Sequence, residues 1–425
     1  MKNSGIEWIG EIPDSWELYK IGSLYHCRNE KVNDTDYPPL SVSKGGVVPQ
    51  MEGVAKSDAT DNRKLVLAND FVINSRSDRK QSCGVSPIDG SVSLINTVLY
   101  TDNQETILPS YANLVMKNYG FAEEFYRWGH GIVADLWTTR WQEMKSIVLP
   151  LPDVKKQTKI VDCVEKKLSQ VDELITNQEK QIVKLKEYKQ SVITEAVTKG
   201  LDKSAPMKDS GIEWIGEIPA HWDTIKIKFT SWLKGRIGWD GLKSTEFIEE
   251  GPFLITGTDF ENGSINWDSC VHISEQRFME DELLHIKEND LLITKDGTIG
   301  KLAIVRNCPE KVSLNSGVMI IRNSTDFKYF DKYLYYLLQS RQFLLWYELS
   351  QSGGSTIRHL YQGQFYNFEY TYPSFNEQKE IAFYLDEKCG KIDRLIAIKQ
   401  EKIEKLQEYK KSLIYEYVTG KKEVV

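Results

Sequence analysis

The chain has 425 residues, of which 40% are hydrophobic and 11% aromatic, and its formal net charge at pH 7 is −7. This length and composition predict two or three domains with packed cores and exclude a disordered chain. The acidic balance excludes binding to nucleic acid by bulk electrostatics alone. Contacts to DNA would have to be concentrated in loops, with a partner supplying part of the phosphate neutralisation.

The sequence gives no indication of export, membrane insertion or metal binding. No charged and then apolar leader follows Met1, and no apolar run approaches about 18 residues. The six cysteines lack a CxxC spacing, and the six histidines lack the spacing of metal ligands. We therefore expect a cytoplasmic protein with reduced thiols and no metal site.

The beginning of the chain recurs in its middle. Residues 1–13 are MKNSGIEWIGEIP and residues 207–219 are MKDSGIEWIGEIP, so the two copies differ at one position, Asn3 against Asp209. Trp16 and Trp222 extend the correspondence. The protein is therefore predicted to be two tandem copies of one unit, each with a leader, a globular domain and a long helix.

Each leader is followed by short strands, turns and helices, which predict the α+β class. Between residues 12 and 152 we expect strands at 65–67, 71–73 and 92–100, a turn at Asn69–Asp70 and a helix at 111–128. Between residues 218 and 373 we expect strands at 291–294, 302–305 and 318–321, a turn at Asp296–Gly297 and a helix at 327–349. The two regions follow one plan with different residues.

Two long stretches, 154–198 and 375–419, carry residues at alternating steps of four and three, which is the spacing of a coiled-coil seam. The seam positions are Val164, Leu168, Val171, Ile175, Gln178, Ile182, Leu185, Lys189, Val192 and Ala196, and Leu385, Cys389, Ile392, Ile396, Lys399, Ile403, Leu406, Lys410, Leu413 and Tyr417. Each stretch is predicted to be one helix, and the first would be about 65 Å long. Since the polar seam positions also match between copies, we expect the helices to pair within the chain. Coiled-coil association between chains is the alternative.

A duplicated scaffold that carries two divergent domains is expected where the scaffold meets the same partner twice and each domain meets something different. A pseudo-twofold chain would place its helices antiparallel and its two domains at opposite ends. Their separation would be roughly one to two DNA turns of about 34 Å.

Several loops carry the donor side chains that DNA recognition uses, which are Arg or Lys against guanine and Asn or Gln against adenine. In the first region these candidates are Asn74, Arg76, Arg79, Lys80 and Gln81 after a predicted strand, and Thr138 and Arg140 beside Trp137. In the second region they are Arg236, then Lys295, Thr298 and Lys301 in and beside a predicted turn, and then Ser355, Thr356 and Arg358. The alternatives are solvated loops and, for Trp137, a place in the core.

The motifs of catalysis are absent from the sequence. The Asp296–Lys301 stretch has two residues between its glycines where a Walker loop needs four, so we expect a tight turn that connects strands. The Pro38–Pro39 pair does not fit the catalytic turn of an adenine methyltransferase, because leucine follows it instead of an aromatic residue. No local Ser/His/Asp or paired-carboxylate constellation is present. We therefore expect a non-catalytic chain.

Taken together, these motifs resemble the specificity subunit of a type I restriction-modification enzyme along the whole chain. The resemblance rests on the duplicated SGIEWIGEIP leaders, Leu149–Pro152 with Gln157, Tyr372–Pro373 with Glu377 and Gln378, the Asp296–Gly300 turn, and Asn69–Arg76 with Gly84–Pro87. One departure is that Tyr370–Ser374 replaces the usual alternation of apolar residues and prolines before the second helix.

The resemblance implies a division of the chain and a set of partners. Residues 1–153 would be a first target recognition domain with its leader, 154–200 a spacer helix, 201–374 the linker, second leader and second target recognition domain, and 375–425 the second spacer helix and tail. Each domain would recognise one half of a split double-stranded DNA sequence, and the helices would bind two methyltransferase subunits. This chain would bind no cofactor. S-adenosylmethionine would belong to the methyltransferase, and ATP and Mg to two motor-nuclease subunits where these join. The alternative is a non-catalytic scaffold that joins proteins through two domains on a coiled coil.

Overall fold

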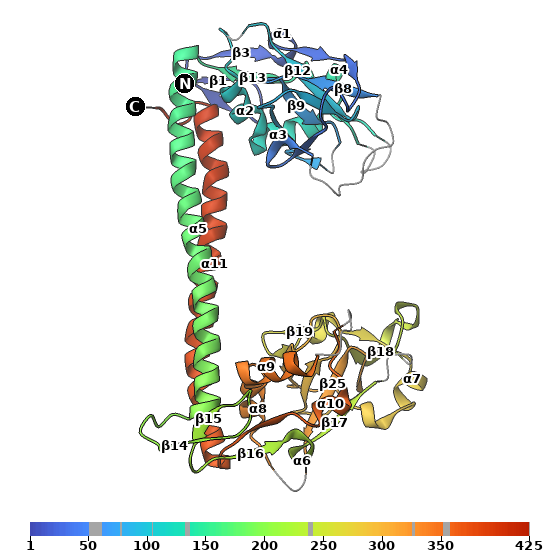
Figure 1. Cartoon of the computed structure of the whole chain (residues 1–425). Coiled ribbons are helices and arrows are strands. Elements are labelled where there is room, and N and C mark those ends of the chain that lie inside the picture. The colour runs from blue at the N-terminus through green and yellow to red at the C-terminus, as the bar shows by residue number, and fades with distance from the viewer. Residues whose placement is uncertain are drawn as a thin grey trace. The chain divides into compact units, whose positions relative to one another are not determined.

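The computed structural model describes residues 1–50, 62–76, 79–103, 105–131, 137–236, 241–324, 328–351 and 358–424. The chain divides into two compact units, unit 1 (Met1–Glu179 with Gln400–Val425) and unit 2 (Lys180–Lys399). Each unit contains a globular domain and part of both long helices (Figure 1). We call the globular parts of units 1 and 2 domain 1 and domain 2.

Short strands dominate both domains (Figure 1). The elements of domain 1 are β1 (Lys2–Asn3), β2 (Glu11–Ile12), β3 (Glu17–Lys20), α1 (Ile21–Leu24), β4 (His26–Arg28), β5 (Lys31–Val32), β6 (Leu40–Ser43), β7 (Gly46–Pro49), β8 (Arg63–Val66), β9 (Phe71–Asn74), β10 (Cys83–Val85), β11 (Gly90–Val92), β12 (Asn96–Tyr100), α2 (Pro109–Lys117), α3 (Tyr119–Arg127), α4 (Trp141–Met144) and β13 (Val148–Leu151). Those of domain 2 are β14 (Met207–Asp209), β15 (Glu217–Pro219), β16 (Asp223–Lys226), α6 (Ile227–Thr230), β17 (Ser231–Gly235), η4 (Ser244–Glu246), β18 (Ile248–Ile255), β19 (Phe260–Glu261), β20 (Ser264–Ile265), η5 (Trp267–Ser269), β21 (Val271–His272), α7 (Glu275–Met279), η6 (Glu282–Leu284), β22 (Leu291–Thr294), β23 (Leu302–Ile304), β24 (Val312–Leu314), β25 (Val318–Asn323), α8 (Asp331–Leu337), α9 (Arg341–Ser350), α10 (Gln362–Phe365) and β26 (Glu369–Tyr372).

The two long helices, α5 (Val154–Lys199) and α11 (Phe375–Val418), pack antiparallel to each other (Figure 1). In unit 1, Asp172 of α5 forms an ion pair with Lys410 of α11. In unit 2, Lys189 Nζ lies 2.7 Å from a carboxylate oxygen of Asp393. The residue numbers of the paired positions thus increase along α5 and decrease along α11. The predicted pairing of the helices within the chain is confirmed.

The alternation of four and three explains this pairing, because it keeps one stripe of each helix against the other. The buried seam residues are Val164, Val171, Gln178, Ile182, Val192 and Ala196 of α5, and Leu385, Cys389, Ile392, Ile403, Leu413 and Tyr417 of α11. Gln178 is 6% exposed among the apolar residues of this stripe. A polar residue at such a position fixes the register at some cost in stability.

The repeated leaders fold in the same way in both units. Gly5 and Gly211 adopt φ values of 72° and 71°, a left-handed conformation that glycine takes without strain. The preceding side chain stabilises each turn, since Asn3 Oδ1 accepts from Gly5 N at 2.9 Å and Asp209 Oδ1 accepts from Gly211 N at 3.0 Å. The one substitution between the leaders therefore retains the acceptor that the turn needs.

A buried glutamine joins the beginning of each long helix to its domain. Gln157 Nε2 donates to the carbonyl of Pro152 at 3.0 Å, and its Oε1 accepts from the backbone of Leu108, the residue before α2, at 2.9 Å. Gln378 makes the same two bonds at 2.9 Å, with Pro373 and with the residue before α8. Both glutamines are fully buried and fully bonded, so the polar group stabilises the junction.

In each unit, a buried tyrosine of the globular domain contacts the C-terminal end of one long helix. The Tyr111 hydroxyl lies 3.2 Å from the carbonyl oxygen of Val418, the last residue of α11. The Tyr333 hydroxyl lies 3.4 Å from the carbonyl oxygen of Val197, in the last turn of α5. Carbonyls in the last turn of a helix lack intrahelical partners, and each tyrosine hydroxyl lies beside one of them. In unit 2 the Thr371 hydroxyl also donates to the Val197 carbonyl, at 2.6 Å. These repeated contacts agree with the predicted tandem organisation.

The central sheets of the two domains have the same strand order. Domain 1 has the antiparallel order β10-β9-β12-β4, and domain 2 has β23-β22-β25-β17. The second strand of each order is buried on both faces: Phe71 and Ile73 pack in one cluster of domain 1, and Val72 packs in another. Burial on both faces explains why β9 and β22 are continuous apolar runs in the sequence.

Two helices expected from the sequence are interrupted. The predicted helix 111–128 is α2 followed by α3, because Asn118 adopts an extended ψ of 161° and its side chain accepts a capping bond from Phe121 N. The predicted helix 327–349 is α8 followed by α9, with an extended conformation at Ser340, and residue 327 lies outside the described ranges. At Asn118 a capping side chain inside an apolar pattern thus ends one helix and begins the next, whereas at Ser340 the backbone turns without a side-chain cap bond.

One expectation about strands also needs correction. The predicted strand 92–100 is the end of β11 followed by β12, in different sheets. The strands that flank the turn at Asn69 do not pair with each other, since β8 pairs with β5 and β11 whereas β9 pairs with β10 and β12. Asn69 has a φ of 73°, so the predicted turn is present, and it connects two layers instead of forming a hairpin.

Gly420, just after α11, is expected to be more sensitive to substitution than Gly5. Both residues have a φ of 72°, so alanine at either site should lower the free energy of unfolding by about 1–2 kcal/mol through backbone strain. A Cβ at Gly420 would lie 2.3 Å from Pro13 Cδ, whereas a Cβ at Gly5 would meet nothing within 4 Å. Urea unfolding should show a larger loss for Gly420→Ala than for Gly5→Ala. Equal losses would contradict this packing.

Candidate nucleic-acid interface

The loop after β9 presents several of the predicted donors of domain 1. Asn74 is half-buried, and its Oδ1 accepts from Arg76 N at 3.0 Å, which turns the chain at the end of the strand. Arg76 and Arg79 are exposed. Gln81 is half-buried at a φ of 63°, and residues 77 and 78 lie outside the described ranges.

Lys80 of this loop is held in place by two neighbours on α3. Its Nζ lies 4.3 Å from the centre of the Tyr126 ring and 3.0 Å from the Glu123 carboxylate. Trp137 also packs against Tyr126 of α3. The centres of the two rings are 5.8 Å apart, and the Trp137 indole N–H donates to the Tyr126 carbonyl at 2.9 Å. Trp137 therefore supports the loop and is neither fully core nor fully exposed.

The structure brings the two predicted loops of domain 1 together. Arg76 and Thr138 form an isolated antiparallel bridge, although 62 positions separate them in the chain. Thr139 N donates to the carbonyl of Ser75, the residue after β9, at 3.0 Å. Arg140 follows at the beginning of α4 and is exposed. We call this meeting point the loop junction of domain 1.

Domain 2 has a loop junction at the corresponding place. Leu360 N donates to the carbonyl of Lys295, the residue after β22, at 3.0 Å. The short helix α10 begins two residues after Leu360, as α4 begins two residues after Thr139. The second residue after β22, Asp296, and the residue before Leu360, His359, form a hydrogen-bonded pair. Sequence reasoning missed this pair because neither residue is a typical DNA donor and the two are 63 positions apart.

The predicted turn after β22 connects two paired strands. Thr294 N donates to Lys301 O at 2.9 Å, and Ile293 of β22 pairs with Leu302 of β23. The Thr294 hydroxyl donates to the Thr298 carbonyl at 2.5 Å. The interpretation of this stretch as a tight turn is therefore confirmed. Thr298 and Lys301 are exposed on it.

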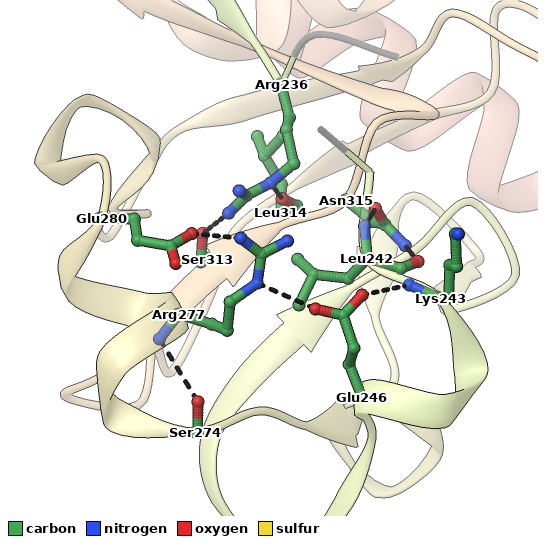
Figure 2. A network of polar contacts seen from close by, with 10 residues as sticks. All are labelled: Arg236, Leu242, Lys243, Glu246, Ser274, Arg277, Glu280, Ser313, Leu314 and Asn315. Atoms are coloured by element: carbon green, nitrogen blue, oxygen red, sulfur yellow. Dashed lines mark hydrogen bonds and ion pairs between the residues drawn. The ribbon is translucent and has the colours of Figure 1, made fainter. Parts of the chain in front are cut away.

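Two predicted donors of domain 2 are inside the domain. Arg236 is 2% exposed, and its Nε donates to the carbonyl of Leu314 on β24 at 3.1 Å (Figure 2). Lys295 is 8% exposed, its Nζ donates to the carbonyl of Arg236 at 3.0 Å, and burial lowers its pKa. Buried cations with carbonyl partners stabilise the packing around them. A direct DNA contact from either side chain stays a prediction, and this conformation does not favour it.

Polar contacts also fix the described residues from Leu242 onward. Beyond residues 237–240, which lie outside the described ranges, Leu242 exchanges two hydrogen bonds of 3.0 Å with the Asn315 side chain (Figure 2). Arg277 of α7 forms an ion pair with Glu246 at 3.0 Å and another with Glu280. The Arg277–Glu246 pair joins α7 to η4, and the Asn315 side chain joins the segment just before η4 to the end of β24.

The third predicted group of domain 2 is described in part. Arg358 is exposed beside the loop junction. Ser355 and Thr356 lie outside the described ranges. Across the described part of the chain, no group of three or more His, Cys, Asp or Glu side chains is arranged to hold a metal ion. In the same residues, no helix combines the length and the apolar character that crossing a membrane requires.

Comparison with known proteins shows which family the chain resembles. The family model described as Type I restriction modification DNA specificity domain matches residues 240–408. The MjaX type I restriction enzyme specificity subunit of Methanocaldococcus jannaschii is 23% identical over 97% of this chain and 95% of its own length. Among solved structures, one from work on complex assembly and conformational transition of the type I R-M system has a TM-score of 0.70 at 15% identity and covers 96% of this chain and 98% of its own. The crystal structure of the HsdS subunit from Thermoanaerobacter tengcongensis has a TM-score of 0.51 at 15% identity and covers 99% and 100%.

These likenesses agree with the two β-rich domains and the antiparallel pair of long helices. Over nearly its whole length the chain is thus similar to type I restriction-modification specificity subunits, and residues 240–408 match the family's DNA specificity domain.

Proposed function

We propose that each domain recognises one half of a bipartite, asymmetric double-stranded DNA site. One observation carries this proposal: the two domains share a sheet order and a loop junction, yet they present different polar side chains there. A common frame with different donors and acceptors is what recognition of two unrelated half-sites requires. Residues 1–153 and 201–374 are the proposed target recognition domains, and 154–200 and 375–425 the proposed spacer helices.

Exposed basic side chains near both loop junctions supply the expected phosphate and base contacts. Arg76, Arg79 and Arg140 are exposed in domain 1, and Lys301 and Arg358 in domain 2. Because the chain has a net charge of −7, its attraction to DNA would come from these local basic side chains and not from its overall charge. A partner would supply further phosphate neutralisation.

We also propose that the long helices dock two methyltransferase subunits. The helix sequences align with an offset of 221 residues, and two aligned pairs of apolar residues are exposed. Leu174 and Leu395 are 45% and 47% exposed, and Tyr188 and Tyr409 are 57% and 45% exposed. Exposed apolar side chains that recur at matched positions favour one partner bound twice.

The proposed complex divides its chemistry among its subunits. The solved structure of highest likeness named above comes from work on the assembly of a type I R-M complex. By this likeness, the docked subunits would transfer methyl groups from S-adenosylmethionine to adenine. Motor-nuclease subunits, where present, would use ATP and Mg. This chain would contribute the sequence recognition and the spacing between half-sites.

Replacement of Arg76 by alanine should weaken recognition of one half-site only, by about 1–3 kcal/mol if the guanidinium makes a bidentate base contact. Arg358→Ala should act on the other half-site. Binding of the assembled complex to DNA with one half-site altered at a time measures both effects. Arg127→Ala is a matched control, because this exposed arginine of α3 pairs with Glu7 and Glu124 and lies outside the loop junction. Equal losses at both half-sites would contradict the modular recognition.

The alternative function, a scaffold that joins proteins through two domains, is consistent with the acidic balance of the chain. It predicts assembly without any sequence preference in DNA binding. The same half-site experiment distinguishes the two functions, since a scaffold would show no difference between altered and unaltered half-sites.

A further inference from the structure

The two loop junctions carry different pairs of side chains at matching positions. In domain 1 these positions are Arg76 and Thr138, which a backbone bridge joins, and in domain 2 they are Asp296 and His359, whose side chains form a hydrogen bond. We propose that the Asp296–His359 pair sets which base domain 2 recognises at one position of its half-site. This inference rests on the proposed function, and it adds a residue pair that the donor pattern of the sequence did not indicate.

The carboxylate of Asp296 can accept a hydrogen bond from the amine of a base, whereas a phosphate would repel it. Its side chain is 41% exposed, so the charge is accessible from outside the domain. The negative DNA backbone repels a carboxylate, whereas the N4 amine of cytosine donates to one in the major groove. An acidic side chain where domain 1 presents an arginine therefore predicts recognition of cytosine at that position.

His359 orients this carboxylate. Its Nδ1 donates to Asp296 Oδ1, and its ring centre lies 4.4 Å from that of Tyr361. The His359 side chain is 22% exposed, which leaves it partly covered and restricted in rotation. With Oδ1 engaged by the imidazole, Oδ2 is the oxygen that Asp296 offers to a base. Asp296 is thus the specificity-determining residue and His359 its positioning residue.

Domain 1 carries a different side chain at the position that corresponds to Asp296. Arg76 occupies the position of Asp296, and arginine pairs most often with O6 and N7 of guanine. One backbone hydrogen bond recurs beside both residues, from Thr139 N to Ser75 O and from Leu360 N to Lys295 O, each at 3.0 Å. The difference between the two bases recognised would therefore come from the side chains and not from the frame.

The test is a map of methylated adenine in cells that express the chain with its methyltransferase subunit. Asp296→Asn should change one position of the domain 2 half-site from cytosine towards adenine, since asparagine pairs with adenine. His359→Ala should relax the preference at the same position by about tenfold, because the carboxylate is no longer fixed. The half-site that Arg76→Ala affects should stay unchanged in both variants.

A matched control is Glu275→Gln, which removes the charge of an exposed acidic residue that pairs with Lys311 in the same domain. Its motif should equal that of the parent chain. If Asp296→Asn lowers methylation evenly at every site with the motif unchanged, the pair merely holds the loops together and the inference fails. The inference also fails if Asp296→Asn methylates the same motif as the parent chain to the same extent.

A second variant tests the inference if Asp296→Asn does not fold. Thermal unfolding of the purified complex identifies such a variant, and Asp296→Glu, which keeps the charge on a longer side chain, then replaces Asp296→Asn. This variant should lower the preference at the same single position, and an unaltered motif would refute the inference. If the parent chain itself directs no bipartite motif, the proposed function fails instead.

Discussion

Removal of one facing heptad from each long helix, residues 174–180 with 402–408, is expected to shorten the spacer of the methylated motif by about three base pairs. Seven helical residues span about 10 Å, and B-DNA advances about 34 Å over 10 to 10.5 base pairs. The contacts Asp172–Lys410 and Gln181–Lys399 bracket the deleted segments, so the removed residues face each other. Removal of a whole heptad also keeps the seam in phase.

Deletion of the same heptad from α5 alone is the matched control. It would offset every seam residue beyond residue 173 from its partner on α11, and Lys189 would no longer meet Asp393. We expect this variant to lose assembly or methylation. Mapping of methylated adenine measures both variants. An unchanged spacer with normal methylation in the double deletion would refute the proposal that the helices set the spacing.

Leu385→Ala is expected to lower the free energy of unfolding by about 2–5 kcal/mol, because it leaves a cavity in a packed core. Leu385 is fully buried in the cluster of unit 2 that joins α11 to α5 and to domain 2. Both the helix pairing and the domain packing lose contacts when this side chain is shortened. Urea-induced unfolding followed by circular dichroism measures the loss.

Leu395→Ala on the same helix is its control. This side chain is 47% exposed, so shortening it should change the free energy of unfolding by no more than about 0.5 kcal/mol. Because Leu395 belongs to the proposed docking surface, the variant should instead weaken binding of the methyltransferase subunit. If both variants destabilise the chain equally, the assignment of buried and exposed helix faces is wrong.

The tandem fold could be predicted from the sequence because its signals are long or repeated. Two copies of a leader and two seams with the same spacing leave little freedom in the organisation of the chain. The interruptions at Asn118 and Ser340 were missed because the apolar pattern continues through them. The break at Asn118 depends on one capping side chain, which periodicity does not detect.

The candidate site was predicted less completely. Donor-rich loops were found by composition, and the structure brings Arg76 beside Thr138. The burial of Arg236 depends on β24, which follows it by some 80 residues, so no local pattern could reveal it. Asp296 and His359 likewise meet through tertiary structure. Local sequence indicates which residues are suited to DNA, and the fold decides which of them face outward.

We propose that this chain alone determines the DNA sequence that its complex methylates. The most direct test is a genome-wide map of methylated adenine in cells that co-express the chain with its methyltransferase subunit, compared with cells that express the methyltransferase alone. We expect a split, asymmetric motif that appears only when the chain is present. No new methylation despite a stable complex in a pull-down, or the same motif without the chain, would contradict the claim.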